Sequence, residues 1–185
     1  MNKVKLKKCR VCKEKFKPFQ TTQVVCGAKC ALEHAKSKRI KEQKTNDRKR
    51  KEKLKTASEY TKEAQASINK YVRIRDINKL CVSCGCSLSN NPLGGGFDCG
   101  HARSRGAASH LKFNLLNMWG QCKRCNRHLG GNYSEYRKEL VNRIGLERVE
   151  KLENDNEPRK FTIAYLVRIK KIFNKRARIY ERRFR

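Results

Sequence analysis

Acidic residues and long apolar runs are both scarce in this sequence. Only 17 of its 185 residues are Asp or Glu, against 47 Lys and Arg, so the formal net charge is +30. No stretch of about 18 apolar residues is present, which argues against a membrane-spanning helix. The first eight residues are basic with no apolar run behind them, which argues against a secretory signal peptide. We therefore expect a cytoplasmic protein with no membrane partner.

The excess of positive charge predicts a polyanionic partner. Each Lys or Arg that meets a phosphate releases condensed counterions, so nucleic acid is the expected partner. A ribosome-associated or merely soluble basic protein is the alternative. Since only 37% of the residues are hydrophobic, a large apolar core is not expected. Small folded pieces then need another source of stability, such as a metal ion.

Cysteine, by contrast, is abundant, with ten residues. Cysteines arranged as CxxC pairs in a reducing compartment indicate zinc rather than disulfides. In the first set, 13 residues separate the two pairs, which is enough for a short hairpin. This spacing predicts a zinc-ribbon-like knuckle over residues 1–34 that does not fold without metal; loose thiols are the alternative. The four predicted ligands are Cys9, Cys12, Cys26 and Cys30.

A second set of four cysteines can close another tetrahedral zinc site. It consists of two CxxC pairs separated by 37 residues: Cys81, Cys84, Cys122 and Cys125. Gly85 frees the chain to turn, so that backbone amides can face the thiolates. Cys86 and Cys99 are left over, and we expect free thiols there unless one of them replaces Cys84.

Between the two sets, residues 35–75 form a basic spacer. Residues 31–55 hold eleven Lys or Arg and four acids, and there is no Gly or Pro from Ala31 to Cys84. This composition predicts either an exposed helix or a disordered basic tether that becomes ordered on DNA; a solvated linker without contacts is the alternative. From Ser58, a predicted N-cap, apolar residues recur at helical spacing over about four turns. That helix should bury Ile68, Tyr71 and Val72 against the central module.

The central module spans residues 76–153. Turn residues predict a loop over 90–96, and Phe97 to Arg103 should form the first strand of a hairpin. Residues 107–114 are a loop or second strand, and a short helix opens at the second zinc pair. One or two further helices follow, with Ser134 as a cap and Gly145 as the end of the first.

Residues 154–185 are predicted to form a separate basic C-terminal helix, from Thr162 to Phe184, for which a membrane-surface role is the competing interpretation. Altogether we expect a small α+β protein. Its parts are the zinc-ribbon-like knuckle, a basic helical spacer, a zinc-stabilised ββα-metal (HNH-like) module and C-terminal helices.

Several residues of the module have the order and spacing typical of an HNH nuclease. Phosphodiester hydrolysis needs a base for water and a cation at the scissile phosphate. His101 is the predicted base, because an unperturbed imidazole titrates near neutral pH. Asp98, with either Asn126 or His128, is predicted to bind a divalent cation, Mg²⁺, whose preference for oxygen favours Asn126. Asn117 should bond backbone across the loop and orient the imidazole of His101.

Each of these residues also has a structural interpretation. His101 would serve as a zinc ligand in place of a cysteine. Asp98 would cap a turn, and Asn117 would be an ordinary loop residue. His128 would contact phosphate or lie free on the surface.

Basic side chains along the chain are predicted to contact DNA phosphates without reading bases, which gives a strong salt dependence. They are Lys49, Arg50, Lys51, Arg103, Arg105, Lys123, Arg124, Arg127, Lys171, Lys175 and Arg178.

Five motifs carry a resemblance over nearly the whole chain: Cys81-Val82-Ser83-Cys84-Gly85, Asp98-Cys99-Gly100-His101, Phe113-Asn114-Leu115-Leu116-Asn117, Gln121-Cys122-Lys123-Arg124-Cys125-Asn126-Arg127-His128 and Tyr136-Arg137-Lys138-Glu139-Leu140. Together with both N-terminal cysteine pairs, they resemble the NinG (Rap) recombination proteins of lambda-like phages. The resemblance implies a structure-selective endonuclease that acts on D-loops and Holliday junctions in a bacterial host cell. It also implies recombination proteins as partners, and a homodimer, since a resolvase usually needs two active sites.

Carried over residue by residue, His101, Asn117 and Asn126 fall on the HNH pattern. The sequence departs from that pattern immediately before the histidine. Many HNH enzymes have an acid there, whereas this chain has Gly100, and Asp98 is the predicted replacement.

Overall fold

The computed structural model describes residues 5–89 and 96–183. The chain contacts divide it into two compact units, residues 1–55 and residues 56–185. Residues 90–95, most of the predicted loop, lie outside the described residues. Both units together contain two two-stranded sheets and several helices among the described residues, so the small α+β class is confirmed.

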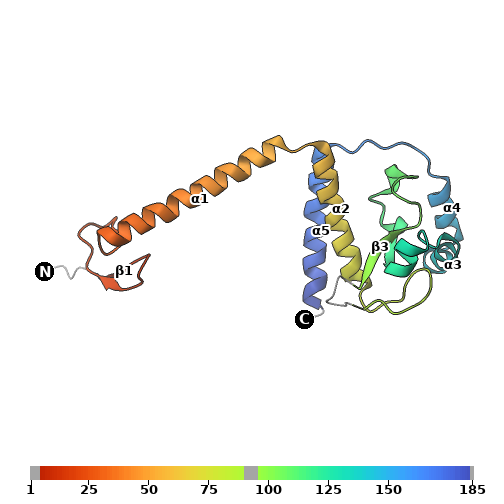
Figure 1. Ribbon diagram of the computed structural model, residues 1–185, viewed down its shortest axis with the longest axis horizontal. Coiled ribbons are helices and arrows are strands. Elements are labelled where there is room, and N and C mark those ends of the chain that lie inside the picture. Colours follow the sequence, from red (N-terminus) through yellow and green to blue (C-terminus); the bar gives the residue numbers. More distant parts are fainter. Residues whose placement is uncertain (1–4, 90–95, 184–185) are drawn as a thin grey trace. The chain divides into compact units, whose positions relative to one another are not determined.

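The first unit is a small knuckle followed by one long helix (Figure 1). Strand β1 (Lys7–Lys8) pairs antiparallel with β2 (Lys15–Phe16). Helix α1 (Ala28–Leu54) then runs for 27 residues without a single buried side chain. Lys, Arg, Glu and Gln are strong helix formers, and the absence of Gly and Pro leaves nothing to break the helix. Of the two alternatives for this segment, the structure shows the exposed helix.

The second unit begins with α2 (Ala57–Asp76), whose N-cap is Thr56 rather than the predicted Ser58. Thr56 accepts a hydrogen bond from the backbone of Glu59, and the Glu59 carboxylate accepts one from the backbone of Thr56. This reciprocal capping box satisfies two backbone donors, which a cap at Ser58 would leave open. The three side chains predicted to be buried on this helix are indeed 0–7% exposed: Ile68, Tyr71 and Val72.

Helix α5 (Ile163–Arg183) lies alongside α2 and covers its apolar face (Figure 1). Leu166, Phe173 and Ala177 are buried in this contact, and the rings of Tyr71 and Phe173 lie 5.3 Å apart. The chain contacts place the unit boundary at residue 55, and α5 packs on α2 within the second unit. Each helix has an apolar stripe that packs on the other, and the stripe of α2 also packs against the hairpin side chain Met118.

A two-stranded hairpin occupies the middle of the second unit. Strand β3 (Phe97–His101) pairs antiparallel with β4 (Met118–Cys122), which places His101 opposite Met118. The residues between the strands form a loop with 3₁₀ turns, so of the two alternatives for residues 107–114 the structure shows the loop.

Three helical segments follow the hairpin. A short helical turn, Arg124–His128, starts between the second pair of cysteines, as predicted. Gly145 separates helices α3 (Tyr133–Ile144) and α4 (Leu146–Asn154). Its φ of 84° is a backbone conformation that glycine adopts without steric strain. The residue before α3 is Asn132 in the left-handed region, and not the predicted cap Ser134. These helices close a second core that contains Val82, Leu111, Tyr136, Leu140, Val149 and Leu152.

Over the described ranges, no helix combines the length and the apolar character that crossing a membrane requires.

Candidate functional site

The first cysteine cluster joins the knuckle to α1. The Sγ atoms of all four cysteines lie within 4.8 Å of one another, and Cys30 is in the first turn of the helix. The Sγ distances are 3.5 Å between Cys12 and Cys26 and 3.6 Å between Cys26 and Cys30. A tetrahedral zinc with Zn–S bonds of about 2.3 Å places its sulfurs about 3.8 Å apart, so this cluster can hold one zinc ion.

The second cluster joins the start of the module to the end of β4. Cys81, Cys84, Cys122 and Cys125 again lie within 4.8 Å of one another, with 3.7 Å between the Sγ atoms of Cys84 and Cys122. Gly85 has a φ of 70°, as its predicted turn requires. The turn brings the backbone of Cys86 to the Cys84 sulfur, and this hydrogen bond is the main reason why the pKa of Cys84 is lowered to about 6. Neither Cys86 nor Cys99 belongs to a cluster.

Within the described residues, these two clusters are the only groups of three or more His, Cys, Asp or Glu side chains that could hold a metal ion. His101 lies in neither of them. Its alternative role as a zinc ligand in place of a cysteine is therefore wrong, because four sulfurs already complete each set.

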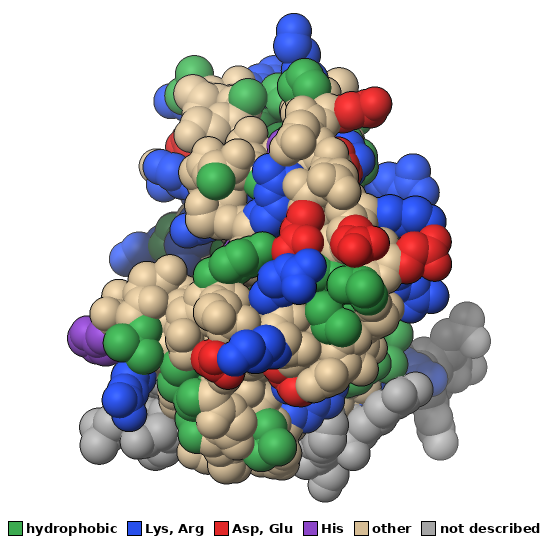
Figure 2. All heavy atoms as spheres, turned by 90° about the vertical axis from the view of Figure 1, so that its right-hand side faces the viewer, with side chains coloured by type: hydrophobic (Ala, Val, Ile, Leu, Met, Phe, Trp, Pro, Cys, Tyr) green, Lys and Arg blue, Asp and Glu red, His purple; other side chains and the backbone are tan. Residues whose placement is uncertain are grey.

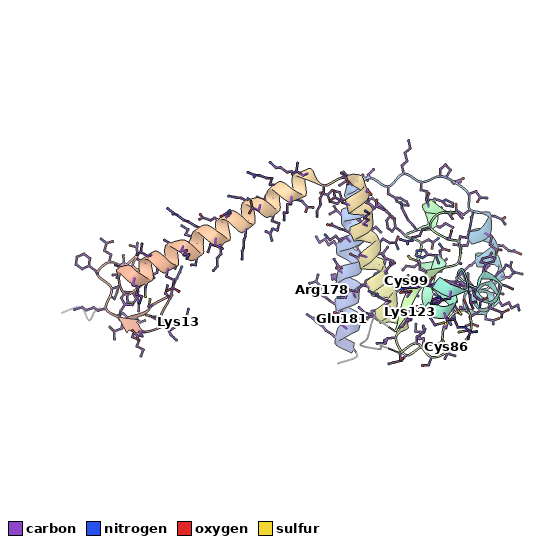
Figure 3. All side chains as sticks on the ribbon, in the orientation of Figure 1. Lys13, Cys86, Cys99, Lys123, Arg178 and Glu181 are labelled. Atoms are coloured by element: carbon purple, nitrogen blue, oxygen red, sulfur yellow. The ribbon has the colours of Figure 1, made fainter. Side chains whose placement is uncertain are left out.

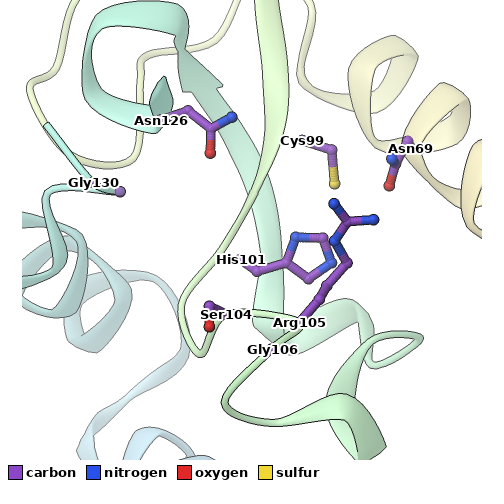
Figure 4. Close-up of a pocket in the computed structure, with 9 residues that line it drawn as sticks. Asn69, Cys99, His101, Ser104, Arg105, Gly106, Asn126 and Gly130 are labelled. Carbon is purple, nitrogen blue, oxygen red and sulfur yellow. The ribbon is translucent and has the colours of Figure 1, made fainter. Parts of the chain in front are cut away.

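His101, at the end of β3, lines a cleft of about 340 Å³. Figure 4 shows its imidazole next to the Arg105 guanidinium, with Cys99 and Asn69 beyond them. Asn126 from the short helical turn lines the same cleft. The Nε2 atom of His101 is buried and has no hydrogen-bond partner among the described residues. His101 thus lines the cleft and carries one buried nitrogen that nothing in the described chain satisfies.

Two effects act in the same direction on the imidazole. Burial, and then the positive charge of Arg105, lower the pKa of His101 to about 4. Hydrogen bonds to the backbone of Lys112 and Cys99 oppose this and only partly offset it. At neutral pH the ring is therefore uncharged, and its free nitrogen can accept a proton.

Asn117 holds the loop that follows His101. Its side chain is fully buried. The amide oxygen accepts a hydrogen bond from the backbone N–H of Arg103 (2.8 Å), and the amide nitrogen donates to the carbonyls of Arg103 (3.0 Å) and Leu111 (3.4 Å). The predicted bonding of Asn117 to backbone across the loop is confirmed. Any effect of Asn117 on the imidazole of His101 is indirect and acts through the shape of the loop.

Asp98 and Asn126 are neighbours, as a shared cation would need. The Asn126 Nδ2 atom lies 3.2 Å from Asp98 Oδ2. Arg127, however, donates two hydrogen bonds to the same carboxylate, at 2.7 and 3.0 Å. Burial would raise the pKa of Asp98, but the hydrogen bonds from Arg127 and Asn126 lower it below its ordinary value. His128 lies exposed on the same short turn.

Gly100 cannot be replaced by the acid that the HNH pattern often has there. A Cβ atom at this position would lie 2.3 Å from Oε1 and 2.9 Å from Cβ of Gln121. Gln121 is itself fully buried, and its Nε2 donates to Ser83 Oγ at 2.7 Å. The departure from the pattern therefore has a packing reason.

The structure places the predicted DNA contacts in different surroundings. Arg103 donates to the carbonyls of Leu152, Glu153 and Asp155, so it caps the end of α4 instead of facing DNA, and Arg127 pairs with Asp98. Arg105 lies in the cleft. Lys123 is half-buried, and the remaining members are exposed: Lys49, Arg50, Lys51, Arg124, Lys171, Lys175 and Arg178.

On the face of the second unit around α3 and α4, acidic side chains lie among the basic ones (Figure 2). Pairs such as Arg143 with Glu139 and Lys151 with Glu147 neutralise each other there. This face is a poor surface for a polyanion.

Sequence reasoning missed several residues of the cleft, among them Asn69 from α2, Cys99 and Ser104. Asn69 lies far from the other lining residues in sequence, and only the packing of α2 on the hairpin brings it there. Cys99 had a signal, since it is two residues before His101 on one strand and therefore on the same face. Its burial raises the pKa of its thiol to about 12.

A family model described as "Bacteriophage Lambda NinG protein" matches residues 1–183. The chain belongs to the NinG family. It is 35% identical over 181 residues to Protein ninG of Escherichia phage 933W, with 88% of each chain covered. It is 34% identical to Protein ninG of Escherichia phage lambda and 32% identical to that of Salmonella phage P22, with 82% of this chain and 81% of each relative covered. No solved structure matches.

The residues that the family model matches include both cysteine clusters and the cleft. The description of the family names no reaction. The residues of the cleft are therefore the basis for its chemistry.

Proposed function

We propose that this chain is a metal-dependent DNA endonuclease of the HNH type that acts on branched recombination intermediates such as D-loops and Holliday junctions. The observation that carries the proposal is that His101, whose buried Nε2 has no partner among the described residues, lines a cleft together with Arg105 and Asn126. A neutral imidazole with a free nitrogen is suited to take a proton from water. The recombination substrate rests on the resemblance to the NinG family.

Arg105 and His101 would act together on a phosphodiester. The guanidinium offers fixed donors for phosphate oxygens. A bound phosphate would also offset the positive charge that holds the pKa of His101 down, so that the imidazole becomes a stronger base once substrate is in place. Asn117 would keep the loop that carries Arg103 and Arg105 in position.

The residues beside the cleft are of the chemical types that bind Mg²⁺. Asp98 and Asn126 offer adjacent carboxylate and amide groups, the oxygen ligands that this ion takes. When bound, the ion would supply positive charge at the scissile phosphate and the leaving oxygen. Asp98 could take part only after Arg127 releases it, so Arg127 would have to turn toward a DNA phosphate.

The test is cleavage of a labelled synthetic D-loop and four-way junction with Mg²⁺, comparing the native chain with His101→Ala. We expect the native chain to cut, and His101→Ala to bind with unchanged affinity but to cut at least about 100-fold more slowly, as for loss of a general base. Equal cleavage by both chains would refute the role of His101. His128→Ala, on the exposed turn, separates the two ligand alternatives: loss of cleavage there would favour His128 over Asn126.

A second candidate is a branched-DNA-binding protein with a degenerate HNH module. Two observations favour it. Asp98 forms an ion pair with Arg127, and Gly100 leaves no room for an acidic side chain. If both chains bind junctions tightly and neither cuts, this candidate is the correct one.

A further inference from the structure

The first unit contains a basic groove whose partner the sequence does not reveal. Its volume is about 530 Å³. One wall is the turn at the first two cysteines, with Arg10 and Val11 between them and Lys13 directly after Cys12. The other wall is one face of α1, because its members recur at steps of three and four residues. These members are His34, Ser37, Lys38 and Lys41.

Charge in this groove is of one sign. Arg10, Lys13, Lys38 and Lys41 line it, and no acidic residue does. Lys38 approaches Glu42 at 3.9 Å, but both side chains are more than 60% exposed, so this pair neutralises little. Four thiolates on Zn²⁺ would leave a charge of about −2 nearby, which is less than the four cations supply.

The two walls are held together by the first cysteine cluster. Cys9 and Cys12 flank the turn, and Cys30 lies in the first turn of α1. Lys13 has a φ of 67° and its backbone N–H donates to the Cys9 carbonyl at 3.1 Å, which fixes the turn. The cations therefore sit on a preformed scaffold, so ordering them on a ligand costs less entropy.

We propose that this groove binds the phosphate backbone of a DNA duplex, as a second DNA site in addition to the His101 cleft. Its cations are exposed at the mouth (Lys13 is labelled in Figure 3), which suits a long polyanion better than an enclosed small molecule. The Ser37 hydroxyl donates within the helix to the His34 carbonyl. The Ser37 hydroxyl is thus already engaged, and the lining cations are expected to contact phosphates, so the groove should bind without sequence preference. The inference rests on the proposed DNA substrate, but not on cleavage.

Two sites on one chain would explain a preference for branched DNA. When one duplex arm is bound by the groove, binding of the junction by the other unit becomes intramolecular. Affinity for a junction then exceeds what either site gives alone.

The test compares two triple variants of the full chain with the same loss of charge. The groove variant is Arg10→Gln/Lys38→Gln/Lys41→Gln. The control is Lys36→Gln/Arg39→Gln/Lys53→Gln, whose three residues lie on α1 and do not line the groove. Binding to a fluorescent linear duplex is measured at several salt concentrations, without added divalent cation. The groove variant should bind about tenfold more weakly, and its salt slope should fall by about 3, since each lost phosphate contact removes about 0.9. The control should change the slope by less than about 1.

Equal losses in both variants would overturn the proposal, because general charge would then explain binding. So would tighter binding of an RNA duplex than of DNA. If the groove variant loses zinc, Lys38→Gln/Lys41→Gln leaves the knuckle itself unaltered and should lower the slope by about 2. In the cleavage assay the groove variant should raise KM and leave kcat unchanged. Failure of the His101 test would leave these binding results standing.

Discussion

At the scale of single residues, Asp76 is a buried charged group that joins two elements of the second unit. Its side chain is fully buried at the end of α2. The carboxylate accepts hydrogen bonds from Arg75 at 2.6 Å, from Lys79 at 3.0 Å and from the backbone N–H of Gly120 at 2.9 Å. It thereby ties α2 to β4, the strand that pairs with the His101 strand.

Asp76→Asn should lower the free energy of unfolding at pH 7 by about 3 kcal/mol, because it leaves a buried guanidinium without its counter-ion. Thermal unfolding measures this loss. The matched control is Glu147→Gln, which breaks an exposed pair with Lys151 and should cost less than about 1 kcal/mol. Similar costs for both would mean that burial of Asp76 contributes nothing.

The pH dependence of this loss has a definite sign. Burial would raise the pKa of Asp76, but the bonds from Arg75, Lys79 and Gly120 lower it below its ordinary value of 3.8. An acid with a lowered folded-state pKa stabilises the fold at pH values above its unfolded-state pKa. This stabilisation is lost as the pH falls through the folded-state pKa. The difference between native chain and Asp76→Asn should therefore be constant from about pH 7 to pH 5 and shrink only in more acidic solution.

At the scale of elements, the close approach of β3 and β4 depends on a glycine. Gly100→Ala would push a methyl group against Gln121. We expect it to destabilise the second unit by about 1–3 kcal/mol through overpacking. Gly106→Ala is the control, because a Cβ there has its nearest neighbour at 3.9 Å. Thermal unfolding of the two variants checks the prediction, and equal stability would mean that Gln121 moves aside freely.

At the scale of the whole molecule, each of the two units has its own four-cysteine cluster. Loss of the first zinc ion should therefore unfold one unit and spare the other. In Cys9→Ser/Cys12→Ser, hydrogen exchange followed by mass spectrometry should show faster exchange in the knuckle, over residues 5–27, and unchanged protection from residue 57 to residue 76.

The control for this experiment is Cys86→Ser, which alters a cysteine outside both clusters and should leave exchange unchanged in both units. Faster exchange throughout the chain of the Cys9→Ser/Cys12→Ser variant would show instead that the two units fold as one.

The sequence alone determined the features that depend on spacing along the chain. Ligand spacing identified both cysteine clusters, and helical periodicity identified the buried face of α2. The bonding of Asn117 across its loop was also predictable, because a buried amide next to a loop must find backbone partners.

Only the tertiary structure decided which groups are free to act. Arg103 and Arg127 look like phosphate contacts in sequence, yet one caps α4 and the other pairs with Asp98. The packing of α5 on α2, and the place of Asn69 in the cleft, depend on contacts between distant segments. The physical reason is that charge and periodicity act locally along a chain, whereas the partner of a charged or apolar side chain is chosen only when distant segments pack.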